Sequence, residues 1–500
     1  MEETKRVAGI LLALSSLPSE YGIGSFGEAA RQWVDFLYSA GQKHWQILPL
    51  NPTSWGDSPY QSFSAFAISP YYIDLDTLLT QRLLMKDELA GINWGKDAER
   101  VDYAALYRER EPVLRKAFSR FKGGADYEQF CAEQAFWLHD YALFMALKQK
   151  NNGRSWLEWE PDLQMREAAA LLRAKTTLKD DRAYHTFVQY VAFTQWKAIK
   201  EYANGRSIGI IGDIPIYVAM DSADVWANSE LFLLDEQHRP IRVAGCPPDS
   251  FAAGGQLWGN PLYRWDRLDQ SAYAWWLSRL RSGFALYDTI RIDHFRGFES
   301  YYAIPAGDAD ASGGHWEKGP GFTFINAVQK ALPQAPIIAE DLGYLTKEVR
   351  DLLAASGYPG MKVLQFAFDS REPSNYMPYT YERNCVVYSG THDNSTSAGW
   401  FMSAPAEDIE AAKTYFGFRQ TPEKREASWA FSRAALSSVA NLAIIPMQDY
   451  LGLGNEARMN TPSTLGSSNW QWRLQPDVLG NEAARAFAQE IRAITVLNGR

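Results

Sequence analysis

The feature that most constrains the fold is the return of short apolar runs along the chain. These runs are rich in branched residues and short enough to be strands. Helical patterns lie between several of them, at 26–41, 271–283 and 346–357, and the last begins with Thr346 as N-cap and ends at Gly357. Strand–helix alternation predicts parallel pairing, and eight strands predict a (β/α)8 TIM barrel. The runs lie at 7–14, 44–50, 208–217, 289–294, 336–341, 362–368, 385–390 and 441–447.

The spacing of the runs is uneven, which predicts insertions in the barrel. We expect residues 1–500 to form one catalytic barrel, because no linker, repeat or low-complexity tract divides the chain. Residues 70–205 are charged and helical in pattern, and predict an inserted, largely helical subdomain. A second, loop-rich insertion is expected at 218–287, with a substrate-covering loop near 245–258.

Charge and cysteine usage exclude several classes of protein. The formal net charge of −9 argues against nucleic acid or an anionic membrane as the main partner. Cys131, Cys246 and Cys385 are far apart and form no CxxC pair, so neither a disulfide framework nor a zinc site is expected. No metal-binding cluster or phosphate-binding loop occurs, so we expect no cofactor and no metal.

The N-terminal apolar run resembles a signal peptide only superficially. Glu2 and Glu3 occupy the region that should be positive, and no cleavage pattern follows. The run is better explained as the first strand, and no apolar stretch is long enough to span a membrane. We therefore expect a cytoplasmic enzyme, or one of the plastid stroma if the source is a plant or alga.

Aromatic residues make up 14 % of the chain, and many lie in Gly- and Pro-rich segments such as NPTSWGDSPYQSF and GGQLWGNPLYRW. One explanation is a large core that uses many aromatic side chains. The other is a set of stacking platforms, because sugar rings present apolar faces and hydroxyl rims to a binding cleft.

Acidic residues follow several of the predicted strands. Asp213, Asp293 and Glu340 end the third, fourth and fifth runs, and the seventh runs into His392 and Asp393. Barrel enzymes carry their chemistry at the C-terminal ends of the strands. A single such acid could be an ordinary helix cap, but a set of them at one rim indicates an active site.

Arg291 and Asp293 share one face of their strand, because strand side chains alternate. A neighbouring guanidinium is expected to lower the pKa of Asp293 and keep it anionic, although a simple ion pair of the barrel core would look the same. A retaining glycosidase needs one carboxylate that attacks and one that protonates the leaving oxygen. Asp293 and Glu340, on neighbouring strands, are the natural pair, and Asp393 would hold sugar hydroxyls.

The sequence resembles the 4-α-glucanotransferases (amylomaltases or disproportionating enzymes) of glycoside hydrolase family 77 in the α-amylase clan. The resemblance covers nearly the whole chain. It rests on LLALSSLPSEYGIGSFG, GDSPYQSFSAFAISPYYIDL, GDIPIYVAMDSADVWAN, AGCPPDSFAAGGQLWGNP, RIDHFRGFE, AEDLG, PGMKVLQFAF, THDN, and RMNTPST with SSNWQWR.

The resemblance implies a role for each matching position. Asp293 matches the nucleophile, Glu340 the general acid/base and Asp393 the stabiliser of the transition state. The substrate-binding positions that it implies are Tyr60, which stacks under the reacting sugar; Arg291 and His392 beside the nucleophile; Pro248, Asp249 and Phe251 of a lid; Trp258; the structural aspartate Asp213; and His294, expected to be a packed or hydrogen-bonding neighbour rather than a base.

Two departures lie beside these motifs. Ser395 follows THDN where many relatives carry aspartate, and Tyr301–Tyr302 stand where Tyr-Trp is usual. We expect both to change the packing behind the site rather than the activity.

The resemblance implies a retaining double displacement. The enzyme would cut an α-1,4 bond of a maltooligosaccharide or starch-like glucan and pass the piece to the 4-OH of another glucan or of glucose. Two alternatives remain: a retaining α-1,4-glucan hydrolase with the same site, and a noncatalytic glucan-binding protein.

Overall fold

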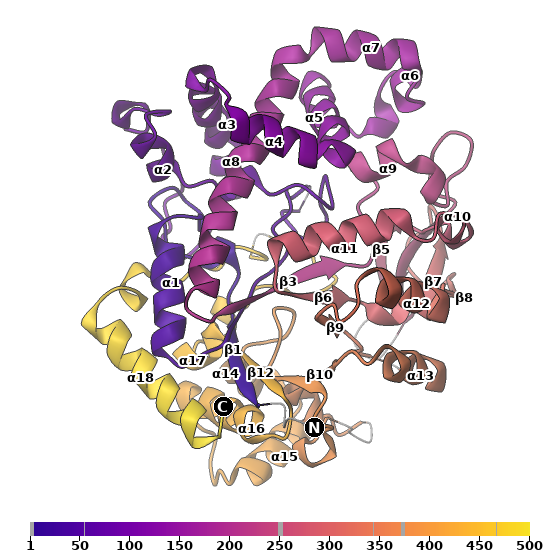
Figure 1. Cartoon of the computed structure of the whole chain (residues 1–500). Helices are drawn as coiled ribbons and strands as arrows, with labels where there is room; N and C mark the ends of the chain where they lie inside the picture. Colours follow the sequence, from indigo (N-terminus) through magenta and orange to yellow (C-terminus); the bar gives the residue numbers. More distant parts are fainter. Residues whose placement is uncertain (1–4, 55, 249–253, 344, 372–375, 467) are drawn as a thin grey trace.

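The structure is a computed structural model that describes residues 5–54, 56–248, 254–343, 345–371, 376–466 and 468–500. In these residues a parallel sheet of eight strands runs in the order β10-β11-β12-β1-β2-β3-β6-β9, and helices surround it (Figure 1). The predicted (β/α)8 barrel is confirmed. Its strands are β1 (Val7–Leu11), β2 (His44–Gln46), β3 (Gly209–Pro215), β6 (Thr289–Asp293), β9 (Ile337–Ala339), β10 (Gly360–Val363), β11 (Cys385–Tyr388) and β12 (Leu442–Pro446).

The barrel closes between β9 and β10. The Ala339 N–H donates to the Pro359 carbonyl over 2.9 Å. The buried Asp341 carboxylate, two residues after β9, accepts the Met361 N–H of β10 over 2.6 Å. A side chain therefore supplies a hydrogen bond where the backbone ladder between these two strands is short.

The sixth predicted run is only partly a strand. The expected strand covered 362–368, but β10 ends at Val363 and Leu364–Phe368 form a short 3-10 helix. The strand instead begins earlier, where Gly360 and Met361 pair with Cys385 and Val386 of β11. Gly360 fits there because a Cβ on it would lie 2.7 Å from the Asp341 carboxylate.

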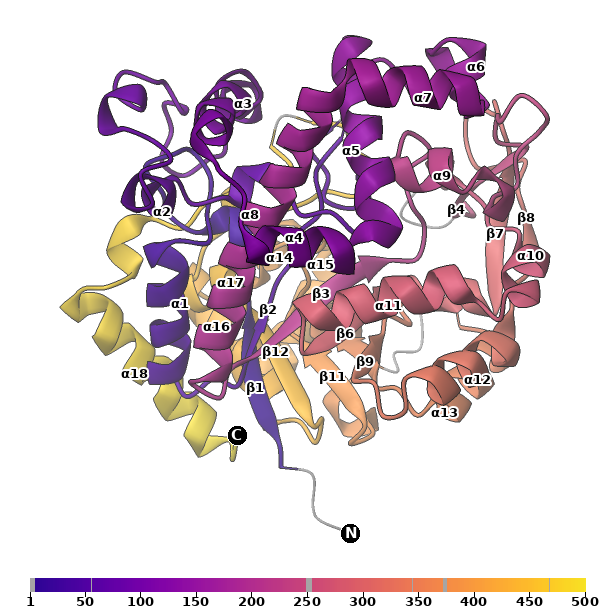
Figure 2. The same ribbon diagram turned by 45° about the horizontal axis from the view of Figure 1, so that its top comes forward.

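Helices between β2 and β3 lie beyond the barrel at the end opposite the C-terminus (Figures 1 and 2). Helix α8 (Lys179–Asn204) links them to the barrel: Phe187 packs on Phe118 and Phe121, whereas Trp196 packs between Phe26 and Trp45. The other helices of this segment are α2 (Leu75–Thr80), α3 (Tyr103–Arg120), α4 (Ala125–Glu133), α5 (Ala135–Lys150), α6 (Pro161–Gln164) and α7 (Ala168–Thr177).

The segment expected to be loop-rich contains strands. β4 (Arg242–Cys246) and β5 (Gln256–Pro261) join β7 (Ser300–Pro305) and β8 (His315–Lys318) in a second, antiparallel sheet, order β5-β4-β7-β8. Glycine and proline interrupt the strand pattern of this segment in the sequence, which hid β4 and β5. This sheet lies beside the C-terminal end of β6, the end of the strands where the sequence predicts the active site (Figure 2).

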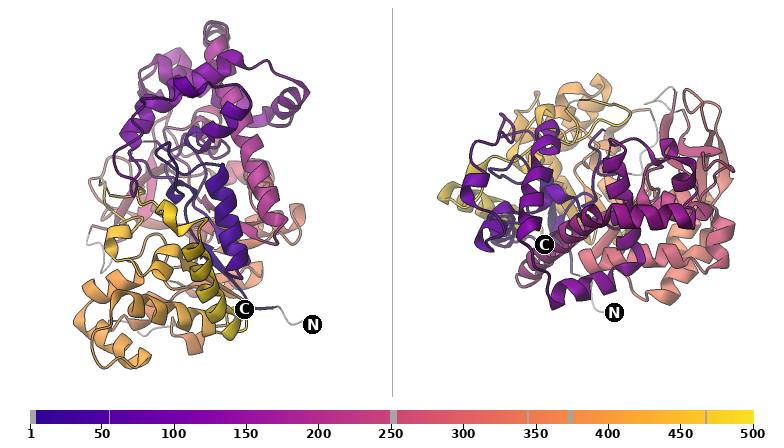
Figure 3. Two further views of the ribbon diagram at one scale, coloured as in Figure 1. Left: turned by 90° about the vertical axis from the view of Figure 1, so that its left-hand side faces the viewer. Right: turned by 90° about the horizontal axis from the view of Figure 1, so that it is seen from above.

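The last helix packs against the first. α18 (Glu482–Leu497) lies along α1 (Glu28–Ser39), with Phe36 near Phe487 and the Gln42 amide donating to Thr495 (Figure 3). The remaining helices are α9 (Ala223–Ala227), α10 (Trp265–Gln270), α11 (Ala274–Leu286), α12 (Gly321–Ala331), α13 (Lys347–Ser356), α14 (Ser397–Ser403), α15 (Ala406–Phe416), α16 (Lys424–Ser437) and α17 (Met447–Leu451). No helix in the described part of the chain is long and apolar enough to cross a membrane.

The seam between β9 and β10 gives a first prediction. Asp341→Ala leaves the buried Met361 N–H without its acceptor, and should lower the free energy of unfolding by about 1–3 kcal/mol. Asp341→Asn keeps an acceptor oxygen and should lose less. Urea denaturation of both variants checks this; equal stability of the two would show that the seam does not need the acceptor.

Candidate active site

A buried arginine organises the centre of the site. Arg291 Nη1 lies 2.6 Å from Asp213 Oδ2 of β3 and 3.0 Å from Asp293 Oδ1 of its own strand. Arg291 Nε donates to Met361 Sδ of β10 over 3.3 Å. The shared face of Arg291 and Asp293, predicted from strand alternation, is therefore occupied by one guanidinium that ties together three strands.

Asp213 lies below the cavity rather than in its wall. Its side chain is fully buried, and the same Oδ2 that meets Arg291 accepts the Tyr60 hydroxyl over 2.7 Å. Tyr60 does line the cavity, and its ring stacks on His392 with centroids 5.2 Å apart. Asp213 is thus placed to orient Arg291 and Tyr60, not to contact a substrate.

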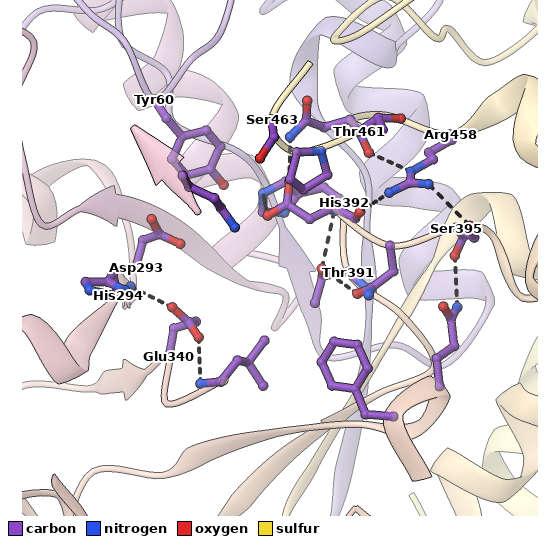
Figure 4. A pocket seen from close by; sticks show the side chains of 18 of the residues that line it. Tyr60, Asp293, His294, Glu340, Thr391, His392, Ser395, Arg458, Thr461 and Ser463 are labelled. Carbon is purple, nitrogen blue, oxygen red and sulfur yellow. Dashed lines mark hydrogen bonds and ion pairs between the residues drawn. The ribbon is translucent and has the colours of Figure 1, made fainter. Parts of the chain in front are cut away.

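Glu340 follows β9 immediately and is fixed by two backbone donors. Its Oε2 accepts the His294 N–H, and its Oε1 accepts the Leu342 N–H, each over 2.7 Å (Figure 4). The backbone of His294 is left-handed, with φ 54°, and this turns the chain directly after β6. Since His294 follows Asp293 directly, this hydrogen bond brings the two carboxylates to neighbouring positions at the same rim.

Burial raises the pKa values of both carboxyl groups. The pKa of Glu340 rises to about 7, through burial and then the charge of Asp293, against the opposing effects of Arg291 and the two N–H donors. The pKa of Asp293 rises to about 6, because burial outweighs the lowering by Arg291, and Asp213 and Asp393 add to the rise. The expectation that Arg291 would leave Asp293 with a lowered pKa is therefore wrong, although Asp293 remains the stronger acid of the pair.

Asp393 reaches the cavity from the loop after β11. Its side chain is 41 % exposed, and Oδ2 lies 3.4 Å from His392 Nε2. Asn460 Nδ2 donates to its Oδ1 over 2.7 Å, and Arg458 Nη2 donates to its backbone carbonyl over 2.6 Å (Figure 4). Asn460 thus holds the carboxylate of Asp393, and Arg458 holds the backbone of the same residue.

Trp258 closes the other side of the cavity. Its Nε1 donates to Gln256 Oε1, and its ring meets His294 edge to face, with centroids 4.9 Å apart. Burial and then Arg296 lower the pKa of His294 to about 3, so the imidazole stays neutral and packs, as expected. Pro248 is exposed and does not line the cavity, whereas Asp249 and Phe251 lie outside the described residues.

These groups surround a cavity of about 810 Å³. Its walls include Asp293 and Glu340 on one side and Asp393 with His392 on the other, and it is large enough for several sugar units of a ligand. Aromatic side chains line it beside hydroxyl, amide and charged groups: Tyr60, Tyr217, Trp258, Phe366, Trp400 and Trp470.

Comparison with known proteins agrees with this geometry. The 4-alpha-glucanotransferase family, Glyco_hydro_77, matches residues 12–479. The chain belongs to the 4-alpha-glucanotransferase family. It is 48 % identical over 491 residues to the 4-alpha-glucanotransferase of Clostridium butyricum. This match covers 97 % of this chain and 99 % of the relative. The Streptococcus pneumoniae (strain ATCC BAA-334 / TIGR4) enzyme is 48 % identical, over 95 % of this chain and 94 % of its own.

A solved structure of the family shares the whole architecture. The amylomaltase from Streptococcus agalactiae, solved in complex with acarbose, superposes with a TM-score of 0.94 at 41 % identity. The match covers 99 % of this chain and 100 % of the other. This chain and the solved amylomaltase therefore share one fold over nearly their whole lengths.

Of the two departures from the family pattern, Ser395 lines the cavity, whereas Tyr301 and Tyr302 are not among its lining residues. Ser395 accepts Arg458 Nη1 over 3.3 Å, and its carbonyl accepts the Gln365 amide. The Tyr302 hydroxyl donates to backbone carbonyls of the β7–β8 connection, and the Tyr301 hydroxyl donates to Glu317. None of these contacts reaches the three carboxylates.

Sequence reasoning missed the residues that hold Asp393. Arg458 and Asn460 stand in RMNTPST, a motif that carried the resemblance but received no role. Trp470, in the neighbouring NWQWR, also lines the cavity and contacts the rings of Tyr60 and His392. The segment follows β12, the last strand of the barrel, so the rule that strand ends carry the chemistry did not point to it.

Arg458 gives the prediction for this site. Arg458→Met removes the donor to the Asp393 carbonyl and frees that loop, so kcat for glucan transfer should fall about 10²-fold with little change in KM. Arg458→Lys should recover part of the rate. Initial rates across substrate concentration check it; an unchanged kcat for Arg458→Met would exclude a positioning role.

Proposed function

We propose that this 4-alpha-glucanotransferase moves α-1,4-glucan segments from a maltooligosaccharide or starch-like donor to the 4-OH of an acceptor glucan or of glucose. The observation that carries the proposal is the Asp293–Glu340 pair: Glu340 accepts the N–H of the residue after Asp293, and its pKa is raised to about 7. A carboxylic acid that keeps its proton near neutrality beside a stronger acid is the arrangement that glycosidic bond cleavage requires.

In the first step, Asp293 attacks the anomeric carbon of the donor while Glu340 gives its proton to the leaving glycosidic oxygen. The C1–O bond breaks as the Asp293–C1 bond forms, and the configuration inverts. Arg291, 3.0 Å from Asp293 Oδ1, holds the attacking carboxylate in one orientation. Asp393 and His392, across the cavity, are placed to bind hydroxyls of the same sugar.

In the second step, the ionised Glu340 takes the proton of the acceptor 4-OH, which attacks C1 and releases Asp293. A second inversion restores the α configuration, and Glu340 regains its proton for the next cycle. Trp258 lies on the Glu340 side and is suited to bind the acceptor ring, because a sugar face can pack on the indole. Holding an acceptor there keeps water from the glycosyl-enzyme.

Location is part of the same proposal. Cys131, Cys246 and Cys385 are free cysteines, which fits a reducing compartment. We place the enzyme in the cytoplasm, or in the plastid stroma if the source is a plant or alga.

Maltotriose distinguishes the proposal from its alternatives. A transferase should convert maltotriose into glucose and a ladder of longer chains with a constant number of reducing ends, whereas a hydrolase raises that number steadily. Asp293→Asn should abolish the ladder, with a loss of at least about 10³-fold, because a neutral amide cannot attack C1. Chromatography of the products with a reducing-end assay checks both points; a ladder from Asp293→Asn would overturn the mechanism.

The pKa values predict a narrow pH optimum. Asp293 must be ionised, so activity should fall as pH drops through about 6; Glu340 must be protonated, so activity should fall as pH rises through about 7. The two limbs belong to the coupled pair. The pH profile of kcat/KM for maltotriose checks this, with the melting temperature followed over the same range as control. A rate still rising above pH 8 would contradict the assignment of Glu340 as acid.

A further inference from the structure

A second cavity, of about 350 Å³, is lined by residues of β7, β8 and the segments that follow β6 and β9. The two cavities have no lining residue in common, but the same two chain segments contribute to both. His294 lines the first and Arg296 the second, on the segment after β6; Leu342 lines the first and Thr346 the second, on the segment after β9. The second cavity therefore adjoins the first on the side of Glu340.

An exposed indole dominates this second cavity. Trp316, on the edge strand β8, is 41 % exposed although it stands in a regular sheet opposite Tyr302. Arg296 lies 3.9 Å from the centre of its ring, and Tyr302 packs edge to face at 5.3 Å. Both contacts fix the ring in advance, so stacking a ligand on its open part would cost little conformational entropy.

The polar groups around Trp316 favour a neutral ligand rich in hydroxyls. Glu299 and Glu348 bring two carboxylates, which accept hydrogen bonds from hydroxyls and repel anions. Two cations, Arg296 and Lys318, and three carboxylates, Glu299, Glu317 and Glu348, line the cavity, so it holds no excess of positive charge for a phosphate. A rigid aromatic ring with acidic neighbours is the composition that suits the apolar face and hydroxyl rim of a sugar.

We propose that Trp316, with Glu299, Thr346 and Glu348, forms an outer binding site for the α-1,4-glucan chain on the acceptor side of the catalytic cavity. The inference rests on the proposed function, because it extends the path of the same substrate. Glu340 protonates the leaving chain and activates the incoming one, so a long chain leaving the catalytic cavity past Glu340 meets Trp316 next. Short substrates end within the first cavity and do not reach it.

The test compares long and short substrates. Trp316→Ala should raise KM for amylose about three- to tenfold, the loss expected for one aromatic contact, with no change in kcat/KM for maltotriose. Trp316→Phe should retain most of the amylose affinity. Tyr38→Ala, which removes an exposed aromatic ring from the outer helix α1, is the matched control and should change neither value.

A binding measurement separates a ligand site from a structural role. In an Asp293→Asn background, which prevents turnover, Trp316→Ala should reduce the retardation of the protein in native gels that contain amylopectin. An amylose KM and a retardation both unchanged would overturn the proposal. An equal loss of kcat/KM on amylose and on maltotriose would also overturn it, because Trp316 would then act by holding Arg296 and the segment after β6 in place. If the wild-type protein showed no transfer between maltotriose molecules, the proposed function itself would be contradicted.

Discussion

The contact on which the site depends is the buried guanidinium of Arg291 between Asp213 and Asp293. Arg291 and Asp213 are buried, and buried charges are stable only if each is paired and hydrogen-bonded; here Tyr60 supplies a further donor to Asp213. Removing Arg291 would leave two carboxylates facing each other without compensation. Arg291 thus has two tasks. Its contact with Asp213 links β3 to β6, and its contact with Asp293, predicted as a possible core ion pair, orients the carboxylate that we assign as nucleophile.

The barrel explains why two carboxylates with different tasks meet. Parallel neighbours β6 and β9 end at one rim, with Ile292 opposite Ala339, so the next residues along each chain reach the same space. The N–H of His294, the residue after Asp293, then donates to Glu340. Because that donor favours the ionised form, the raised pKa of Glu340 shows that burial and the neighbouring charge are the stronger effects.

Much of this could be predicted from the sequence, since it depends on local pattern. The eight strands and the acids that end them follow from apolar runs and their boundaries, although β10 begins earlier than expected. The pKa of Asp293 could not be predicted, because its burial depends on cavity walls that distant segments contribute. Nor could the role of Arg458 and Asn460, whose partner Asp393 is far away in sequence. The antiparallel sheet could not be predicted for two reasons. Glycine and proline interrupt β4 and β5, and β4 pairs with β7, which follows β6 in the sequence.

The two carboxylates that we assign as reacting groups lie at the ends of β6 and β9, whereas segments outside the eight strands supply most of the cavity. Tyr60 comes from the loop after β2, Trp258 from β5 of the second sheet, and Trp470 from the chain after α17. A barrel alone would leave Asp293 and Glu340 open to solvent, with ordinary pKa values and no means to prefer a sugar acceptor over water. Transfer therefore depends on the added segments as much as on the carboxylates, and differences among related enzymes in acceptor length should be sought there rather than in the strands.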